Sequence, residues 1–180
     1  MIFVIIGGGA AGFSAAVKYS ELTRGESRIA LINHGPLGDT CVNVGCIPSK
    51  QLLHIAKKIH ELRSINIPGV EVDPTPPDIK RVMKDVRKLV KYMRREKYED
   101  LLMNFDNIDH IIVKAYFRSP HEIVVENCGE LIIRGRRILI ATGSRPAIPN
   151  IPGLESVGYY TSNSIWSLDK DIDNMLIIGG

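Results

Sequence analysis

The first apolar positions of the chain form one short continuous run, Ile2–Ile6, as expected for a strand that is buried on both faces. A glycine-rich turn follows. Apolar residues then recur at a spacing of three to four up to Gly25, which predicts a helix. A second apolar run covers Arg28–Ile32. Strand, turn, helix and strand in this order predict a βαβ unit, and therefore a parallel sheet with a right-handed crossover.

Two further stretches have the hydrophobic period of a helix. Ser49–Arg63 carries an apolar stripe, and the longer stretch Asp78–Met103 follows a cluster of prolines. One face of the longer stretch is basic, with the residues Lys80, Arg81, Lys84, Arg87, Lys88, Lys91, Arg94, Arg95 and Lys97. A nucleic-acid contact and a solvated helix face both explain this pattern, and we favour the solvated face.

After Asp109 the pattern changes to short strands separated by turn residues. We expect a small β-meander appended to the parallel sheet, built from His110–Phe117, Glu122–Glu126, Leu131–Arg134 and Arg137–Ala141. An extended proline-containing linker follows, with a short helix at Ser162–Leu168. The last residues, Ile177–Gly180, repeat Ile5–Gly8. They therefore predict the first strand and turn of a second dinucleotide-binding unit, and we expect these residues to be part of a longer protein.

Composition narrows the class of protein. The 180 residues are 44% hydrophobic and 24% charged, which is typical of a globular protein. The net charge of +3 is too small to indicate nucleic-acid binding, and three cysteines are too few for a small secreted disulfide scaffold. No apolar run reaches the roughly 18 residues that a membrane span needs. We therefore expect a cytoplasmic protein that contacts neither membrane nor nucleic acid.

The turn after the first strand contains the motif Gly7-x-Gly9-x-x-Gly12. In such a motif the first glycine permits a tight turn and the second lets the backbone approach a pyrophosphate. The third lets the helix pack close to the sheet. Inside a βαβ unit, this motif predicts a dinucleotide site with the phosphates at the helix N-terminus.

An acidic residue normally ends the second strand of such a site and accepts a hydrogen bond from a ribose hydroxyl. In this chain the position is Asn33. An amide oxygen can accept the same bond without charge assistance, so we expect a weaker hold on the ribose. A turn residue without a ligand is the alternative role for Asn33.

A second motif, Cys41-Val42-Asn43-Val44-Gly45-Cys46-Ile47-Pro48-Ser49-Lys50, contains two cysteines. Their spacing does not match a common zinc site, so we predict no resident metal. A cycling redox pair, a structural disulfide and two buried thiols remain as interpretations. A position at a helix start beside Lys50 favours the redox pair, since a helix N-terminus and a cation stabilise a thiolate. Cys128 lies in an expected hairpin turn and is most simply a small structural residue.

Together, Gly7–Gly12, Cys41–Lys50 and Ala141–Gly143 resemble the pyridine nucleotide–disulfide oxidoreductases, which are flavoenzymes. The resemblance extends over essentially the whole chain. Three stretches are most similar to the mercuric reductase branch of that family, namely Arg95–Leu102, Pro146–Leu154 and Gly158–Ser162. The sequence Ile47-Pro48-Ser49-Lys50 also resembles the dihydrolipoyl dehydrogenases.

The resemblance implies a fold, a cofactor and site residues. The fold would be a Rossmann-like α/β domain whose parallel sheet has a helical hairpin crossover and an added β-meander. The cofactor would be FAD, bound by Gly7, Gly9, Ala11, Gly12, Asn33, Gly38, Thr40, Cys41, Lys50, Ala115, Thr142 and Gly143. Cys46 would face the flavin, Cys41 would exchange with the substrate, and Lys50 would lie beside the flavin ring. Departures from the family pattern are Asn33 in place of Glu, Asp39 in place of Gly and Val113 in place of Gly.

The resemblance also implies a reaction. Electrons would pass from NAD(P)H through FAD to a Cys41–Cys46 disulfide, and then to Hg(II) or to a small dithiol or disulfide. Hg(II) would be a substrate at the two cysteines, since a soft ion suits paired sulfur. A non-catalytic nucleotide-binding or redox-sensing module is the alternative function.

The resemblance divides the chain into three parts. Residues 1–145 would be the FAD-binding domain, 146–173 a linker, and 174–180 the start of an NAD(P)-binding domain. A complete enzyme of this family would be a homodimer. We expect the 180 residues alone to be inactive, because the nicotinamide site would lie in the second domain.

Overall fold

The computed structural model describes residues 2–70, 75–126 and 130–179. Its strands are β1 (Ile2–Ile6), β2 (Arg28–Asn33), β3 (Ile108–Ile112), β4 (Ala115–Ser119), β5 (Glu122–Glu126), β6 (Glu130–Arg134) and β7 (Arg137–Ile140). Its α-helices are α1 (Ala10–Leu22), α2 (Thr40–Asn43), α3 (Cys46–Arg63), α4 (Ile79–Arg94), α5 (Asp100–Leu102) and α6 (Leu154–Val157). A π-helical turn, η1 (Arg95–Glu99), joins α4 to α5, and η2 (Ile165–Ser167) is a 3₁₀ turn.

The chain divides into two compact units. The first unit consists of Met1–Asn43 and Lys91–Arg145, and the second of Val44–Val90 and Pro146–Gly180. The boundaries predicted from the sequence for a flavin domain, a linker and the start of a second domain stay predictions.

The first unit is built on a four-stranded sheet with the order β3-β2-β1-β7. Every neighbouring pair in it is parallel, and β1 pairs with β2 from Ile2 opposite Arg28 to Ile6 opposite Ile32. The parallel βαβ unit predicted from the apolar runs is thereby confirmed.

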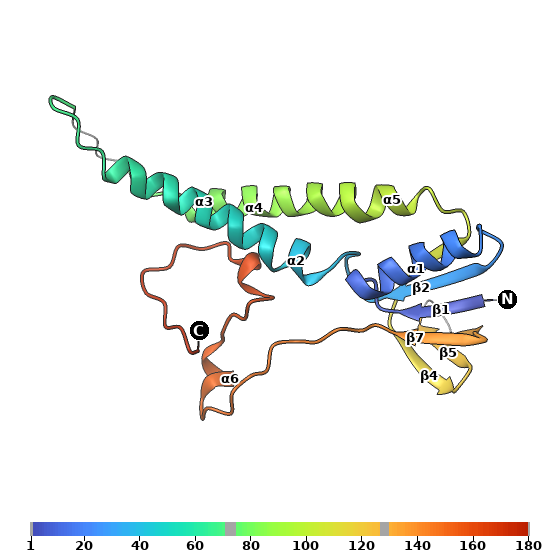
Figure 1. The fold of residues 1–180 in the computed structure, drawn as a ribbon. Helices are drawn as coiled ribbons and strands as arrows, with labels where there is room; N and C mark the ends of the chain where they lie inside the picture. The colour runs from blue at the N-terminus through green and yellow to red at the C-terminus, as the bar shows by residue number, and fades with distance from the viewer. Residues whose placement is uncertain (1, 71–74, 127–129, 180) are drawn as a thin grey trace. The chain divides into compact units, whose positions relative to one another are not determined.

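Both faces of this sheet are covered, which explains why its strands are continuously apolar. Successive residues of β1 enter different cores, because side chains alternate across a strand. Ile5 packs with Phe13 of α1 on the helical face, and Val4 packs with Ile123 of β5 on the other face. Val4, Ile5 and Ile123 are fully buried, and Phe13 is 5% exposed. Burial of each such side chain stabilises the folded state by about 1.5–3 kcal/mol. Figure 1 shows α1 on one side of β1, β2 and β7, with β4 and β5 on the other side.

The second layer of strands is an antiparallel sheet with the order β4-β5-β6. The expected meander is present, but two of its boundaries were wrong. The single strand expected at His110–Phe117 is instead two strands in two different sheets. The chain bends at Val113, whose N–H donates to the carbonyl of Asn33 (2.9 Å) at the end of β2. The strand expected at Arg137–Ala141 joins the parallel sheet as β7.

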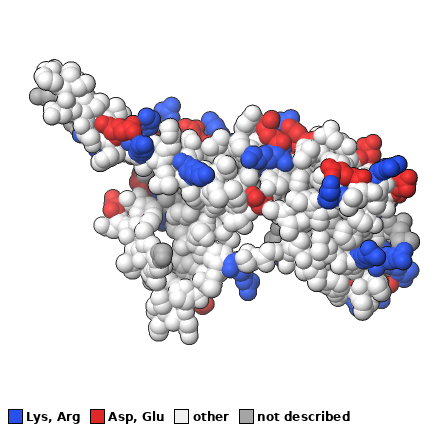
Figure 2. Space-filling view, in the orientation of Figure 1, with Lys and Arg blue, Asp and Glu red and all other residues white. Residues whose placement is uncertain are grey.

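The helical stretch expected at Asp78–Met103 is present as α4, η1 and α5 in succession, with a π-helical turn that the periodicity did not indicate. Part of its basic face is neutralised by carboxylates of the same stretch. Lys88 lies 3.6 Å from Asp85, and Arg95 lies 3.3 Å from Asp100. On the face shown in Figure 2, Lys and Arg side chains are intermixed with Asp and Glu side chains.

The second unit contains α3, most of α4, and η2. Trp166 of η2 donates from Nε1 to the carbonyls of Val44 (2.8 Å) and Ser162 (2.9 Å). Arg87 of α4 donates to the carbonyls of Trp166 (2.9 Å) and Leu168 (3.1 Å), which ties η2 to the helix. The helix expected at Ser162–Leu168 is therefore only this short turn. Among the helices of the described residues, none is both long and apolar enough to cross a membrane.

Candidate nucleotide-binding and redox site

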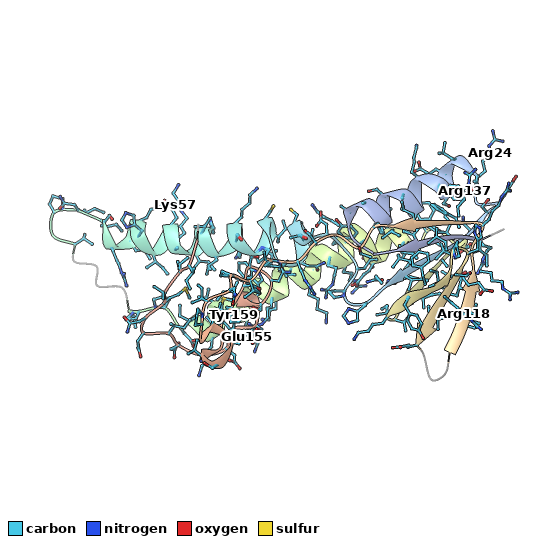
Figure 3. All side chains as sticks on the ribbon, turned by 90° about the horizontal axis from the view of Figure 1, so that it is seen from below. Arg24, Lys57, Arg118, Arg137, Glu155 and Tyr159 are labelled. Carbon is cyan, nitrogen blue, oxygen red and sulfur yellow. The ribbon has the colours of Figure 1, made fainter. Side chains whose placement is uncertain are left out.

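A groove of about 630 Å³ lies at the carboxyl ends of the parallel strands in the first unit. This edge of a parallel sheet is where α/β folds bind their ligands. The turn after α1, which contains Arg24, and the start of β7 at Arg137 lie at the opposite edge (Figure 3). The groove is lined by Ile6, Gly7, Gly8, Gly9, Ile32, Asn33, His34, Gly35, Pro36, Gly38, Thr40, Val113, Lys114, Ala115, Tyr116, Glu126, Ala141, Thr142, Gly143 and Ser144.

The glycine turn between β1 and α1 forms one wall of the groove, and each glycine of its motif has a different environment. A Cβ on Gly7 would lie 2.1 Å from the carbonyl oxygen of Ala141, and a Cβ on Gly12 would lie 1.8 Å from that of Gly7. Apart from its two chain neighbours, a Cβ on Gly9 would meet no atom of the described residues within 4 Å. Gly7 and Gly12 are therefore required by packing within the protein, whereas Gly9 leaves space in the groove.

Gly9 is also the N-cap of α1, and no side chain caps this helix. The first N–H groups of a helix have no intrahelical partner, so they are available to an anion. Gly8, which the motif leaves unspecified, is constrained as well. A Cβ there would lie 2.9 Å from both Asn33 and Leu37.

Asn33 ends β2 and is only 8% exposed. Its Nδ2 donates to the carbonyl of Gly35 (2.7 Å), and its Oδ1 lies within hydrogen-bond distance of Nε2 of His110 on β3. Since a carbonyl can only accept, Nδ2 must face Gly35, and His110 must then donate to Oδ1. The amide orientation is therefore set by the protein, and with respect to the described residues one N–H and one lone pair of the Asn33 side chain remain for a ligand.

His110 is half-buried, and this burial lowers its pKa from the ordinary value. The nearby Glu99 carboxylate acts in the opposite direction and is the smaller effect. Burial thus favours the neutral imidazole, and the bond to Asn33 places its proton on Nε2.

The predicted cofactor residues fall into four places. Eight of them line the groove together, namely Gly7, Gly9, Asn33, Gly38, Thr40, Ala115, Thr142 and Gly143. Ala11 and Gly12 lie in the first turn of α1 beside it. Cys41 belongs to α2, which begins at the groove residue Thr40, and Lys50 belongs to α3 in the second unit.

The two cysteines belong to different helices. Cys41 is partly buried in α2, whose first turn is capped by Asp39, since Asp39 Oδ1 accepts the Val42 N–H (2.8 Å). Cys46 is exposed at the first residue of α3, with Gly45 as N-cap and no capping side chain. Among the cysteines that the structure describes, neither forms a disulfide. Cys128 lies outside the described residues.

Reasoning from the sequence missed His110 and Tyr98. His110 reaches Asn33 because β3 pairs with β2, with Asn33 opposite Ile112, and no local pattern indicates that pairing. Tyr98 lies in η1, where its ring packs edge-on against Phe13, with ring centres 4.9 Å apart. The sequence around Tyr98 had contributed to the resemblance, but it indicated no role for this residue.

Residues 1–180 match the family model described as "Pyridine nucleotide-disulphide oxidoreductase". The mercuric reductase of Bacillus cereus is 37% identical over 177 residues, which cover 98% of this chain and 27% of that protein. The dihydrolipoyl dehydrogenase of Buchnera aphidicola is 36% identical over 182 residues, which cover 98% of this chain and 37% of that protein.

A solved structure is also similar, that of a Cu(II) complex of the HOCl-induced flavoprotein disulfide reductase RclA from Escherichia coli. It has a TM-score of 0.75 and 31% identity, and the match covers 93% of this chain and 34% of that one. The chain therefore spans about a third of the proteins that it matches. The chain belongs to the pyridine nucleotide-disulphide oxidoreductase family.

Proposed function

We propose that this chain is the flavin-binding part of an NAD(P)H-dependent disulfide oxidoreductase whose redox pair is Cys41 and Cys46. The observation that carries the proposal is the continuity of the groove with the cysteine segment. Gly38 and Thr40 line the groove, and Cys41 is the next residue in α2. A ligand held along this wall would end beside a cysteine.

FAD fits the residues of the groove. The open space at Gly9 and the uncapped start of α1 suit a pyrophosphate, which requires close backbone approach and N–H donors. Asn33 would bind a ribose hydroxyl with its remaining N–H or lone pair. Ala115 would meet the adenine through its backbone, and Thr142 and Gly143 would cover the cofactor from the end of β7. The chemistry that FAD would supply is the transfer of two electrons from a nicotinamide donor to the cysteine pair.

The cysteines would cycle between a disulfide and two thiols. Two electrons and two protons break the Cys41–Cys46 bond, and the thiolate forms then bind or exchange with the substrate. Cys46 would be the thiol nearer the flavin and Cys41 the thiol that meets the substrate. Lys50, one turn beyond Cys46 in α3, would stabilise the negative charge of the reduced state.

Hg(II) is the substrate that we propose, because paired thiolates are the ligands that soft metal ions prefer. The balanced reaction is NAD(P)H + Hg(II) → NAD(P)⁺ + H⁺ + Hg(0). The identity to mercuric reductases supports this choice. A dithiol substrate is the second candidate, and the identity to a dihydrolipoyl dehydrogenase favours it.

The test is steady-state NAD(P)H oxidation by the purified full-length protein, with Hg(II) in excess thiol or with lipoamide as acceptor. We expect Cys41→Ser to retain reduction of the flavin by NAD(P)H and to lose turnover with either acceptor. Cys128→Ser is the matched control and should keep full activity. Unchanged turnover in Cys41→Ser would refute the assignment of the redox pair. A preference for lipoamide over Hg(II) in the parent protein would contradict Hg(II) as the substrate but would leave the assignment of Cys41 and Cys46 as the redox pair unchanged.

A further inference from the structure

The segment that carries Cys41 is held by the π-helical turn η1 and by the residue before it. Arg94 donates from one nitrogen to Glu99 Oε1 (3.2 Å) and from another to Asn43 Oδ1 (3.3 Å). Asn43 in turn donates to the carbonyl of Leu37 (3.1 Å). Leu37 and Asn43, at the two ends of the segment 37–43, are therefore both linked to Arg94 at the end of α4.

The ring of Tyr98 contacts the middle of the same segment. Gly38 has a positive φ of 104°, and a Cβ there would lie 3.1–3.2 Å from two ring carbons of Tyr98. The ring also packs edge-on against Phe13, which is buried in the core of the helical face. A π-helical turn shifts the side chains that follow it around the helix axis, and such turns are frequent at functional sites. Here it brings Tyr98 onto the residues that lead into α2.

The Tyr98 ring lies against Gly38, the residue before Asp39, and the Asp39 charge acts on its phenol. Burial raises the pKa of Tyr98, and the Asp39 charge adds to this effect. The phenol therefore keeps its proton at neutral pH and is a hydrogen-bond donor. Asp39 also caps α2 through the bond from the Val42 N–H. This carboxylate is the departure from the glycine that the family pattern has at this position.

We propose that Tyr98 and Asp39 are a pair of positioning residues that orients α2 and sets the reactivity of the Cys41 thiol. The proposal rests on the proposed function only in taking Cys41 as the thiol that reacts with substrate. Asp39 precedes Cys41 by two residues, and a nearby negative charge disfavours a thiolate. The hydroxyl of Tyr98 offsets that charge by donating to it, so the two side chains affect the thiol in opposite directions.

Other charged groups near this segment do not explain the same effect. Arg94 reaches it only at Asn43 and is paired with Glu99. His110 lies within hydrogen-bond distance of Asn33, and its pKa is affected by Glu99. Asp39 caps the helix that contains Cys41, and the Tyr98 ring lies against the residue before Asp39, so these two residues are the pair to which we assign the effect.

The test is the rate at which iodoacetamide alkylates Cys41 in the reduced full-length protein, quantified by peptide mass spectrometry at pH 7. Since a tenfold change in thiolate fraction corresponds to one pKa unit, we expect changes of about threefold to tenfold. Tyr98→Phe, which keeps the ring and its packing, should slow alkylation of Cys41. Asp39→Asn, which keeps a capping oxygen and removes the charge, should accelerate it. Tyr92→Phe is the matched control, because Tyr92 is an exposed tyrosine of α4, and it should leave the rate unchanged.

A purely structural role would loosen α2 in both variants and change both rates in the same direction. Equal rates in all variants, or changes of the same sign in Tyr98→Phe and Asp39→Asn, would therefore overturn the proposal. Alkylation of Cys41 can be measured without enzymatic turnover, so this test is independent of the proposed redox function. If Cys41→Ser keeps full activity while the opposite changes in alkylation are observed, the redox assignment fails and the pair stands.

Discussion

The three glycines of the turn after β1 allow the packing role and the ligand role of one motif to be separated. Gly9→Ala adds a methyl group that meets no atom within 4 Å in the described part of the chain beyond its two neighbours, and the Gly9 φ of −78° suits alanine. Alanine restricts the unfolded chain, which stabilises the protein by about 0.4–1 kcal/mol. It is a poorer N-cap than glycine by about 0.5–1 kcal/mol. The two effects cancel, so the free energy of unfolding without ligand should hardly change.

Cofactor binding should respond differently. A methyl group at Gly9 would occupy the space proposed for the pyrophosphate, and overpacking of this kind costs about 1–3 kcal/mol. At 1.4 kcal/mol per factor of ten, this corresponds to a loss of about 5- to 150-fold in FAD affinity. Gly12→Ala is the contrasting variant. Its Cβ would lie 1.8 Å from the carbonyl oxygen of Gly7, so α1 must move and the protein itself should lose about 3 kcal/mol or more.

The assay combines urea unfolding of the apoprotein with FAD titration followed by flavin fluorescence, both on the full-length protein. The expected pattern is a stable Gly9→Ala that binds FAD poorly and a destabilised Gly12→Ala. If Gly9→Ala bound FAD as tightly as the parent, the glycine turn would not be the pyrophosphate site. If Gly12→Ala unfolded at the same urea concentration as the parent, the close approach of α1 to β1 would be wrong.

Two further predictions concern stability. Asn107→Ala removes the buried amide that accepts from Ser20 Oγ (2.7 Å) and donates to the Ser27 carbonyl (2.8 Å), so urea unfolding should show a loss of about 1–3 kcal/mol. The exposed Asn104→Ala is its control, and equal losses in both variants would contradict the role of burial. Because the folded-state pKa of His110 is lowered, the unfolded state binds more protons below about pH 6.5. The parent should therefore lose stability as the pH falls from 7 to 5, and His110→Gln should lose less; an identical pH dependence in both proteins would contradict the effect of burial on His110.

Local patterns in the sequence predicted the central part of this fold because that part is determined locally. A strand buried on two faces is continuously apolar, as in β1 and β2, and the glycine spacing identifies the turn between β1 and α1. The separation of β3 from β4 could not be predicted in the same way. Both strands lie within one apolar stretch, and only the pairing of β3 with β2 makes the chain bend at Val113.

The same distinction applies to the site. The residues that we propose to contact a nucleotide through backbone and small side chains were predicted from the motif and the resemblance, and eight of them line one groove. His110 and Tyr98 act through partners 77 and 59 positions away in sequence, Asn33 and Asp39. Such pairs follow from strand order and from a π-helical turn, and neither leaves a periodic signal in the sequence.

Whether this chain couples a flavin to a cysteine pair can be read from one anaerobic titration of the purified full-length protein with dithionite. A flavin takes up two electrons and a disulfide takes up two more. We therefore predict that the parent consumes about four electrons per bound flavin and that Cys41→Ser consumes about two. Equal consumption by the two proteins would contradict the coupling of the flavin to Cys41 and Cys46.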